Sequence, residues 1–403
     1  MESLAGVGRM RILYISYDGL TDALGQSQIL AYQKNICSKE IEVSILSFEK
    51  AQVYAKLGDQ VQATCHQAGI RWIPLPYTKT PPLFSTLWDL RKAWKKIVQL
   101  QKETPFDIVH CRGYISALLG EEMKGTFGTP FIFDMRGWWP DEKKESGMWS
   151  SAVYWPVYAY FKKKEKDFFR HADEVVSLTE KGKHEIITQK WQVGEKIGVI
   201  STCTDLRLFQ PIEEGKKIER KVSLGFPPHA KILVYSGALG GNYPLSDIFL
   251  FLNSFLHLSP SHHCLILSKD PLPENIALPE RTVMTSVRYA EVGELLAMCD
   301  AGLIYYTQAY SNIGRCPTKL GEYWASGLIA FSPSGIGDLD ALFQTYPAAG
   351  VCVPNWTHEE IVASFSVLSQ PVDKKALYQA AQDFFSLEKG ITFYRNLYLK
   401  LAS

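Results

Sequence analysis

Short apolar runs alternate along the chain with longer segments in which apolar and polar residues mix. In the first half, these runs predict buried strands at residues 11–16, 42–46, 106–110, 131–134 and 174–178. The segments between them are long enough for helices, notably at residues 26–38, 87–103, 151–171 and 181–191. Nearly continuous apolar strands that alternate with helices predict a parallel sheet covered on both faces.

The second half repeats this pattern. Its predicted strands are residues 232–235, 264–267, 282–285, 302–305, 328–331 and 350–353. A charged segment with a Pro-Pro break, residues 204–228, predicts a linker. The whole pattern predicts an α/β protein with two doubly wound parallel-sheet domains, residues 1–203 and 229–380, that face each other across a cleft. The aromatic residues of 381–403 predict a C-terminal helix that packs back, crossing to the N-terminal domain.

Length and composition agree with this plan. A chain of 403 residues exceeds the usual size of a single core. Its net charge of +1 gives no global field that would attract nucleic acid. We expect no signal peptide in the first ten residues and no membrane span. The eight cysteines lack a Cys-x-x-Cys pair, which favours the reduced thiols of a cytoplasmic protein over a disulfide framework or a zinc site.

Ligands of doubly wound sheets bind beyond the carboxyl ends of the strands, so the loops there are candidate sites. After the first strand, Gly25 and Gln26 belong to a loop whose glycines allow close backbone approach to a ligand. A turn with a helix cap is the alternative. The loop lacks Gly-x-Gly-x-x-Gly, and no acidic residue closes the second predicted strand, which argues against a dehydrogenase.

Two further strand ends in the first half carry charged groups. His110 ends the third predicted strand and Arg112 follows it, while Asp134 ends the fourth and Arg136 follows, beside the tryptophans at 138–139. Indole faces next to carboxylates are typical of a carbohydrate site, in which Asp134 and Arg136 act on the sugar. A buried structural ion pair between these two residues is the alternative.

The second half offers a glycine-rich loop and a helix start. Gly237 and Gly240 follow a strand, which suggests amides that face a phosphate, with a plain turn as the alternative. Residues 317–322 predict a helix that begins with proline at its first position and runs to about Ser326. Lys319 opposes the helix dipole there but suits a phosphate, and Glu322, one turn on, suits a sugar diol. An ordinary surface helix is the alternative.

The order and spacing of these motifs resemble the family-four retaining glycosyltransferases, which have the two-domain GT-B fold. The similar segments are residues 17–28, 172–179, 197–211, 237–243 and 317–327. The resemblance implies that Glu322 binds the nucleotide ribose, that Lys319 and the Thr318 amide hold the diphosphate, and that Arg288 with Tyr289 lies by the base.

Carried over in full, the resemblance implies three sets of site residues. The donor-binding set is Gly237, Gly240, Arg288, Asn312, Thr318, Lys319 and Glu322; the catalytic set is Asp134 and Arg136; the acceptor-side set is Gly25, Gln26, His110 and Arg112. The first domain would bind the acceptor and the second the nucleotide sugar.

Two positions depart from the family pattern. Gly314 stands where many members have a glutamate that contacts the donor sugar, and Ala238 stands in the loop where many have arginine and lysine. A catalytically inactive homologue that binds sugar nucleotides, or supports another transferase, is therefore the first alternative. A nucleotide-sugar epimerase of the same fold is the second.

The resemblance implies a retaining, hexosyltransferase-like enzyme without a cofactor, whose substrate is a UDP- or GDP-sugar. It implies metal independence, and we expect that the chain has no Asp-x-Asp sequence to hold a divalent ion. The acceptor would be a saccharide or a lipid-linked sugar in surface polysaccharide or glycolipid biosynthesis. The expected location is cytoplasmic, peripheral on the inner face of the cell membrane.

Two segments suggest contact with an anionic membrane. Residues 149–169 combine aromatic side chains with Lys162, Lys163, Lys164 and Lys166, and a second basic cluster lies at residues 91–96. Aromatic and basic residues together suit an interfacial helix. The alternative is that the aromatic residues are core and the lysines form a solvated face.

Overall fold

The structure, a computed structural model, describes residues 9–241 and 243–402. The chain forms two compact units. The first comprises Met1–Pro140, Tyr154–Ile200 and Leu387–Ser403, and the second comprises Asp141–Val153 and Ser201–Ser386. Residues 1–8, on which the expectation of no signal peptide rests, lie outside the described residues, as does Asn242 of the glycine-rich loop.

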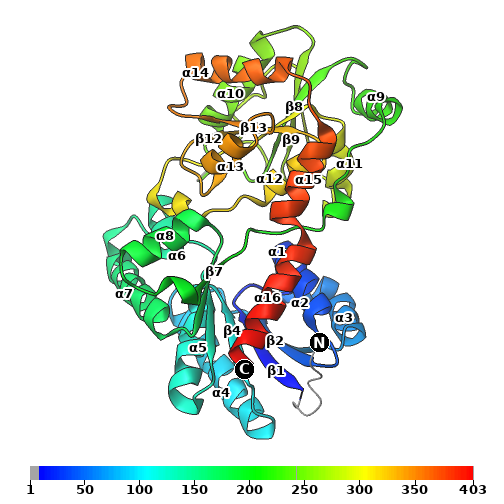
Figure 1. Cartoon of the computed structure of the whole chain (residues 1–403). Helices are drawn as coiled ribbons and strands as arrows, with labels where there is room; N and C mark the ends of the chain where they lie inside the picture. Colours follow the sequence, from blue (N-terminus) through cyan, green and yellow to red (C-terminus); the bar gives the residue numbers. More distant parts are fainter. Residues whose placement is uncertain (1–8, 242, 403) are drawn as a thin grey trace. The chain divides into compact units, whose positions relative to one another are not determined.

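The first unit contains a seven-stranded parallel sheet with the strand order β3-β2-β1-β4-β5-β6-β7 (Figure 1). Its strands are β1 (Met10–Ser16), β2 (Ile41–Glu49), β3 (Arg71–Pro76), β4 (Ile108–Arg112), β5 (Phe131–Asp134), β6 (Glu174–Ser177) and β7 (Ile197–Val199). Its helices are α1 (Ala23–Gly25), α2 (Ala31–Ile36), α3 (Ala51–Gln67), α4 (Phe84–Glu103), α5 (Gly113–Phe127), α7 (Trp155–His171), α8 (Glu180–Thr188) and α16 (Leu387–Ala402). A π-helical turn, Gln26–Leu30, joins α1 to α2.

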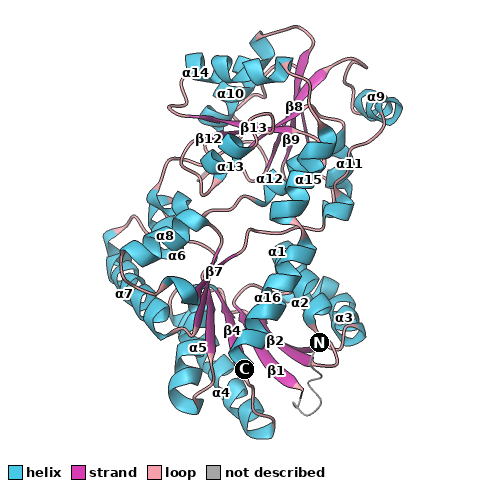
Figure 2. Cartoon of the chain, in the orientation of Figure 1, coloured by secondary structure: helices cyan, strands magenta, loops and turns pink. Residues whose placement is uncertain are grey.

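The second unit contains a six-stranded parallel sheet with the order β10-β9-β8-β11-β12-β13 (Figure 2). Its strands are β8 (Lys231–Ser236), β9 (His262–Leu267), β10 (Thr282–Thr285), β11 (Ala301–Leu303), β12 (Ile329–Pro333) and β13 (Gly350–Val353). Its helices are α9 (Glu214–Ser223), α10 (Leu245–His257), α11 (Tyr289–Ala297), α12 (Thr318–Ala325), α13 (Leu339–Thr345), α14 (His358–Ser364) and α15 (Lys374–Phe385). Helix α6 (Trp139–Glu145) spans a boundary between the units.

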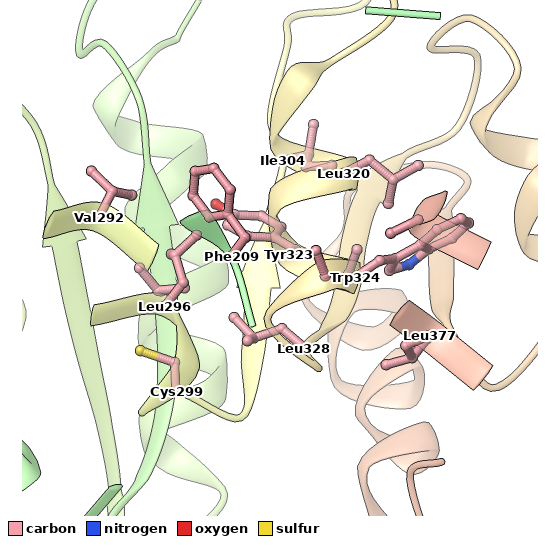
Figure 3. Close-up of a cluster of buried hydrophobic side chains, with 14 of the residues drawn as sticks. Phe209, Val292, Leu296, Cys299, Ile304, Leu320, Tyr323, Trp324, Leu328 and Leu377 are labelled. Carbon is pink, nitrogen blue, oxygen red and sulfur yellow. The ribbon is translucent and has the colours of Figure 1, made fainter. Parts of the chain in front are cut away.

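The second sheet is covered on both faces, as its sequence pattern predicts. Ile232 and Val234 of β8 belong to one core cluster, whereas Leu233 and Tyr235 belong to another. Successive side chains of a strand point to opposite faces, so apolar residues at every position need two covering layers. Figure 3 shows part of the first cluster, in which Trp324 of α12 packs among apolar side chains. The helix that carries the candidate site is thereby anchored in the core.

The predicted fold class is confirmed: two parallel sheets with flanking helices make up the described chain. Two edge strands escaped the sequence analysis. β3 contains Pro74 and Pro76, which are tolerated because an edge strand need not donate every hydrogen bond. β7 has only three residues, too few for a hydrophobic pattern. Strand β2 also runs three residues beyond its predicted end, to Glu49.

The predicted linker and C-terminal helix have different boundaries in the structure. Residues 204–228 belong to the second unit and contain helix α9, so they are not a free linker. The aromatic tail divides into α15, which stays in the second unit, and α16, which belongs to the first. Figure 1 shows α16 in red beside α2. Residues 141–153, which we predicted in the first domain, belong to the second unit.

Within the described residues, no helix combines the length and apolar character needed to cross a membrane. The eight cysteines are all free thiols.

Candidate functional site

The start of α12 lies beyond the carboxyl ends of the second sheet's strands, where we expected a ligand. Helix α12 begins at Thr318, and Pro317 is its N-cap with φ −66° and ψ 116°. The proline therefore stands one position before the predicted one. Its side chain does not cap the helix. The Leu320 amide donates to Pro317 O at 3.1 Å, and the positive end of the helix dipole suits an anion.

Glu322 lies on α12 and is only 1% exposed. Its Oε2 lies 2.8 Å from Lys319 Nζ, and its Oε1 accepts a hydrogen bond from the Tyr289 hydroxyl at 3.2 Å. Thr204 Oγ1 lies 2.9 Å from the same hydroxyl. Burial, reinforced by the charge of Glu322, raises the pKa of Tyr289, so its hydroxyl remains protonated and can donate. We call Thr204, Tyr289, Lys319 and Glu322 the Glu322 cluster.

The Glu322 cluster brings together opposite charges with different accessibility. Lys319 keeps 30% of its side chain exposed, whereas the Glu322 carboxylate is enclosed. A phosphate could approach the ammonium group from solvent, and Glu322 could offer an oxygen to a hydroxyl that displaces the Tyr289 or Lys319 contact. The sequence predicted two of these residues for the donor site. It named Tyr289 only as a neighbour of Arg288 and placed Thr204 in a linker.

The glycine-rich loop after β8 is internally hydrogen-bonded. The amide of Gly237 donates to Leu267 O at 3.1 Å, and the amide of Gly240 donates to Tyr243 O at 2.9 Å. Between them, the Leu239 amide donates to Asp270 Oδ2 at 2.9 Å. Gly240 has φ +88°, a conformation that favours glycine. These three amides are therefore engaged, in contrast to the predicted set of phosphate-facing amides.

Two other predicted donor residues lie in different surroundings. Arg288 is the N-cap of α11, and its side chain is 85% exposed and paired with Glu291. Asn312 is buried, and its side-chain Nδ2 donates to Thr307 O at 2.9 Å, while its backbone carbonyl oxygen accepts from Gly337 N at 2.8 Å. The structure does not bring Arg288 into the Glu322 cluster, and it makes Asn312 a link between loops.

Arg315 is a cation of this region that the sequence analysis did not select. Its guanidinium lies over the ring of Tyr306, 4.7 Å from the ring centroid, and 3.8 Å from Glu142 Oε1. Burial raises the pKa of Glu142, although Arg315 opposes that change. Only its position two residues before Pro317 could have suggested Arg315 from the sequence.

The first unit has a second polar cluster, at the carboxyl ends of β4 and β5. His110 Nδ1 lies 2.7 Å from the Tyr398 hydroxyl, and His110 Nε2 lies 3.4 Å from Asp134 Oδ2. Tyr394 donates its hydroxyl to the same Asp134 oxygen at 3.0 Å. Arg136 Nη1 lies 3.8 Å from Asp134 Oδ1. We call these five residues the His110 cluster; both tyrosines come from α16.

The charges of the His110 cluster follow from burial and contact. Burial alone would raise the pKa of Asp134, but the charge of Arg136 and the contact with His110 together hold it below its ordinary value. Burial lowers the pKa of His110, although Asp134 opposes that change. At neutral pH, Asp134 is therefore charged and His110 is neutral. Arg136 has φ +56°, an uncommon conformation outside glycine that is held by the structure around it.

The acceptor-side loop is built around a carboxylate that the sequence analysis missed. Strand β2 ends at Glu49, which accepts hydrogen bonds from the amides of Leu20 and Thr21 at 2.7 and 3.1 Å. The expectation that no acidic residue closes the second strand is therefore wrong. Glu49 is buried, and its carboxylate oxygens accept hydrogen bonds from the loop backbone. Because these oxygens are already engaged, Glu49 does not suit the ribose hydroxyls of a dinucleotide.

Glycine at position 25 is required by close packing in the same loop. A Cβ atom there would lie 2.0 Å from Gly19 O. Gln26 donates from Nε2 to Thr21 O at 3.3 Å, and Arg112 Nε lies 3.8 Å from Asp18 Oδ2. The structure thus places these predicted acceptor-side residues around one loop and one strand end.

The predicted aromatic sugar platform is not supported. Trp138 is fully buried, and the half-buried Trp139 packs against Phe161 with ring centroids 5.0 Å apart. The two indoles therefore pack against the hydrophobic core and do not form an open face for a sugar.

An Asp-x-Asp sequence does occur, at residues 338–340, which corrects the expectation that the chain has none. Asp338 is the N-cap of α13, and Asp340 Oδ2 accepts from Gly335 N at 2.9 Å. Among the described residues, no three His, Cys, Asp or Glu side chains are grouped to hold a metal ion.

A model of a known protein family matches the first part of the chain. Residues 28–201 match the model of the glycosyl transferase 4-like domain. Over these residues, the chain is similar to that domain. This domain includes His110, Arg112, Asp134 and Arg136, but Tyr394 and Tyr398, which complete the His110 cluster, lie outside the matched range.

Solved structures similar to the whole chain have the GT-B fold. Sucrose-phosphate synthase from Thermosynechococcus elongatus is 15% identical with a TM-score of 0.68, over 98% of this chain and 99% of its own. Anabaena HepE, solved with UDP-glucose, is 13% identical with a TM-score of 0.68, over 97% and 100%. WaaG, a glycosyltransferase involved in lipopolysaccharide biosynthesis, is 14% identical with a TM-score of 0.66, over 95% and 99%. No curated protein sequence gives a significant match. The predicted resemblance to the GT-B glycosyltransferases is confirmed by the domain and the fold.

Proposed function

We propose that this chain transfers a sugar from a nucleoside diphosphate sugar to a saccharide or lipid-linked acceptor, with retention and without a metal ion. The observation that carries the proposal is the Glu322 cluster, which pairs an accessible ammonium group with an enclosed carboxylate at a helix start. A nucleoside diphosphate needs both groups, because its phosphates are anionic and its ribose has two neighbouring hydroxyls.

The donor would bind through the second unit. Lys319 and the Thr318 amide at the start of α12 would hold the diphosphate, and Glu322 would accept hydrogen bonds from the ribose, with Tyr289 orienting the carboxylate. Anabaena HepE was solved in complex with UDP-glucose, which makes a UDP-hexose the first donor to test, with GDP-sugars next.

Bond breaking between the sugar and the diphosphate leaves negative charge on the leaving phosphate. The fixed dipole of α12 and the charge of Lys319 would stabilise that charge, and preorganised groups of this kind contribute several kcal/mol, on the order of 3 for one donor. The acceptor hydroxyl would then attack from the face that the diphosphate leaves, which gives retention.

The His110 cluster would serve the sugar side of the reaction. Asp134 is enclosed by Arg136, His110 and Tyr394, so we assign it to positioning Arg136 and not to contact with the sugar. Arg136 keeps 15% of its side chain exposed and is the charged member of the cluster that could touch a substrate.

Surface polysaccharide or glycolipid biosynthesis is the proposed setting, with the protein in the cytoplasm and peripheral on the inner face of the cell membrane. The involvement of WaaG in lipopolysaccharide biosynthesis supports this setting.

A catalytically inactive homologue remains the second candidate, for specific reasons. The donor-sugar glutamate of many relatives is replaced by Gly314, and three amides of the loop around Ala238 are already engaged. Lys319 and Glu322 also satisfy each other when no ligand is bound.

One experiment separates these candidates. The chain is screened by thermal shift against UDP, GDP, ADP and their sugars, since a ligand that binds only the folded state raises the melting temperature. Donors that bind are then tested for nucleotide release with saccharide acceptors, and the anomeric configuration of any product is read by NMR. Stabilisation without release in any acceptor mixture would favour the inactive homologue, and an inverted product would refute retention.

A further inference from the structure

An apolar stripe lies exposed at the beginning of α4. Phe84, Leu87 and Trp88 are 73%, 64% and 59% exposed, and their spacing of three and four residues places them on one face of the helix. The opposite face is buried and is formed by Ser85, Asp89, Ala93, Ile97 and Leu100. Large apolar side chains gathered in this way mark an interaction site more often than a plain surface.

The stripe is held in place by its buried face. Asp89 accepts hydrogen bonds from the Tyr17 hydroxyl at 3.1 Å and from the Thr78 amide at 3.0 Å. Lys92 Nζ lies 2.8 Å from Asp89 Oδ1. These contacts fix the rotation of α4, so the exposed face cannot turn inward without breaking them.

The residue before the helix is also held outward, in a strained conformation. Leu83 has φ 68° and ψ −54°, and the Phe84 amide donates to Pro82 O at 2.9 Å, which closes a γ-turn. This turn with positive φ is rare and strained for a leucine. Leu83 remains 40% exposed and extends the apolar surface by one residue.

Cationic residues continue the same face. Arg91 and Lys95 follow Trp88 at spacings of three and seven residues, and both are exposed. Among the described residues, neither cation forms an ion pair with an acidic side chain, whereas the neighbouring Lys92 pairs with Asp89. Arg91 also helps to line a hollow of about 400 Å³ with Pro81, Phe84 and Trp88. The helix therefore presents apolar side chains first and positive charges next to them.

We propose that this surface, formed by Leu83, Phe84, Leu87, Trp88, Arg91 and Lys95, docks on an anionic lipid bilayer. Aromatic and aliphatic side chains would enter the boundary between headgroups and acyl chains, and the two cations would meet lipid phosphates. A second copy of the chain fits less well, because two such surfaces would bring like charges together. Docking on a bilayer would bring the proposed transferase close to a lipid-linked acceptor. Vesicle binding can be measured whether or not the chain transfers a sugar.

The other membrane segment expected from the sequence is occupied by the fold only in its later part, since Val153 and Tyr160 are 76% and 48% exposed. In α7, Phe161, Phe168 and Phe169 are buried, and Lys164 pairs with Glu121 at 2.6 Å. Lys162 also pairs with the buried Glu165. Trp155, at the start of α7, is 67% exposed and stands apart from these contacts. It supplies a matched control for Trp88.

The test is co-sedimentation of the full chain with vesicles of phosphatidylglycerol mixed with phosphatidylcholine, at low salt. We expect the parent to bind, and Trp88→Ser combined with Leu87→Ser to lower the partition coefficient at least about 10-fold, because two exposed apolar side chains lose their burial in lipid. Arg91→Gln with Lys95→Gln should lower it roughly 25-fold, at about 5-fold per charge near an anionic surface. Trp155→Ser should bind as the parent does.

Melting temperatures and vesicles of phosphatidylcholine alone complete the design. The stripe variants should keep the parent's melting temperature, because the altered side chains are exposed. The proposal is overturned if the parent fails to sediment with anionic vesicles, or if Trp155→Ser loses binding and the Trp88 variant does not. It is also overturned if analytical ultracentrifugation shows a dimer that the stripe substitutions dissociate, since the occupant is then a second copy. UDP binding serves as a separate readout of the proposed function.

Discussion

At the scale of single residues, the pair of Lys319 and Glu322 is best understood as a site whose two members hold each other until a ligand arrives. The two residues lie one helical turn apart and their charged groups are 2.8 Å apart, and Tyr289 supplies a second partner to the carboxylate. Such a pair stabilises the free protein, so a ligand must offer each member a replacement of similar strength.

This arrangement predicts how substitutions divide between ligands. Lys319→Ala should weaken binding of a nucleoside diphosphate by about 10- to 100-fold and leave the bare nucleoside nearly unchanged, because a charge-assisted hydrogen bond contributes about 1.5–3 kcal/mol. Glu322→Gln should weaken both ligands. Titration calorimetry with UDP and uridine measures the difference. The exposed Lys375→Ala is the control, and parent-like UDP binding by Lys319→Ala would remove the phosphate from this site.

His110 predicts a dependence of stability on pH. Burial holds its folded-state pKa below the ordinary value of about 6.5, so the unfolded chain takes up the proton first as the pH falls. The stability that this group contributes is present above about pH 6.5 and is lost as the pH falls through the folded-state pKa. The loss is at most about 1.4 kcal/mol per pH unit for one proton. Melting curves from pH 7.5 to 5 should show it, and His110→Gln should flatten the dependence; an unchanged slope would contradict the assignment.

The sequence predicted site residues that lie close together along the chain, and it missed those that reach the site from distant segments. Lys319 and Glu322 stand in one helix, so their spacing could be read directly. Glu49 ends a strand that runs longer than its apolar pattern, and Tyr289 reaches Glu322 from another helix. Arg288, in contrast, has an adjacent acidic partner three residues on, and that local pairing decides where its side chain lies.

At the scale of elements, the clearest difference concerns α9, in the segment predicted as a linker. Its charge clusters indicated a solvated segment, but Lys217 and Lys221 are buried against Asp300, at 2.7 and 3.7 Å. The apolar stems of lysine can cover a core while the ammonium groups find an acid. The sequence signal failed because the partner carboxylate lies about eighty residues further along the chain.

Asp300 should therefore be important for the stability of the second unit. Asp300→Asn leaves two buried ammonium groups without a charged partner, and we expect a loss of about 2–4 kcal/mol, less than for a fully enclosed pair because Asp300 is partly exposed. Asp205→Asn, which breaks the exposed pair with Arg207, should cost less than about 1 kcal/mol. Urea unfolding of both variants gives the comparison, and equal losses would show that α9 is not held by this contact.

At the scale of the whole molecule, the chain returns at its end to the unit in which it began. Helix α16 belongs to the first unit and provides Tyr394 and Tyr398 to the His110 cluster. The parallel sheets could be predicted because their strands have nearly continuous apolar runs. The partners of α16 could not, because an aromatic tail shows that a helix packs but does not show which polar groups its hydroxyls meet.

The contribution of α16 can be tested without removing it. Tyr394→Phe combined with Tyr398→Phe keeps both rings but takes hydrogen-bond partners from Asp134 and His110, and each loss should cost about 1–3 kcal/mol in a buried site. Hydrogen exchange should then rise in β4 and β5 of the first sheet, while β8 and β12 of the second keep their protection. Arg395 lies on the same helix as the two tyrosines, and Arg395→Gln, which breaks an exposed pair with Glu40, is the control and should change little. A similar rise in both sheets would mean that the tyrosines support the molecule as a single cooperative unit, and that the His110 cluster is not the point at which α16 stabilises the first unit.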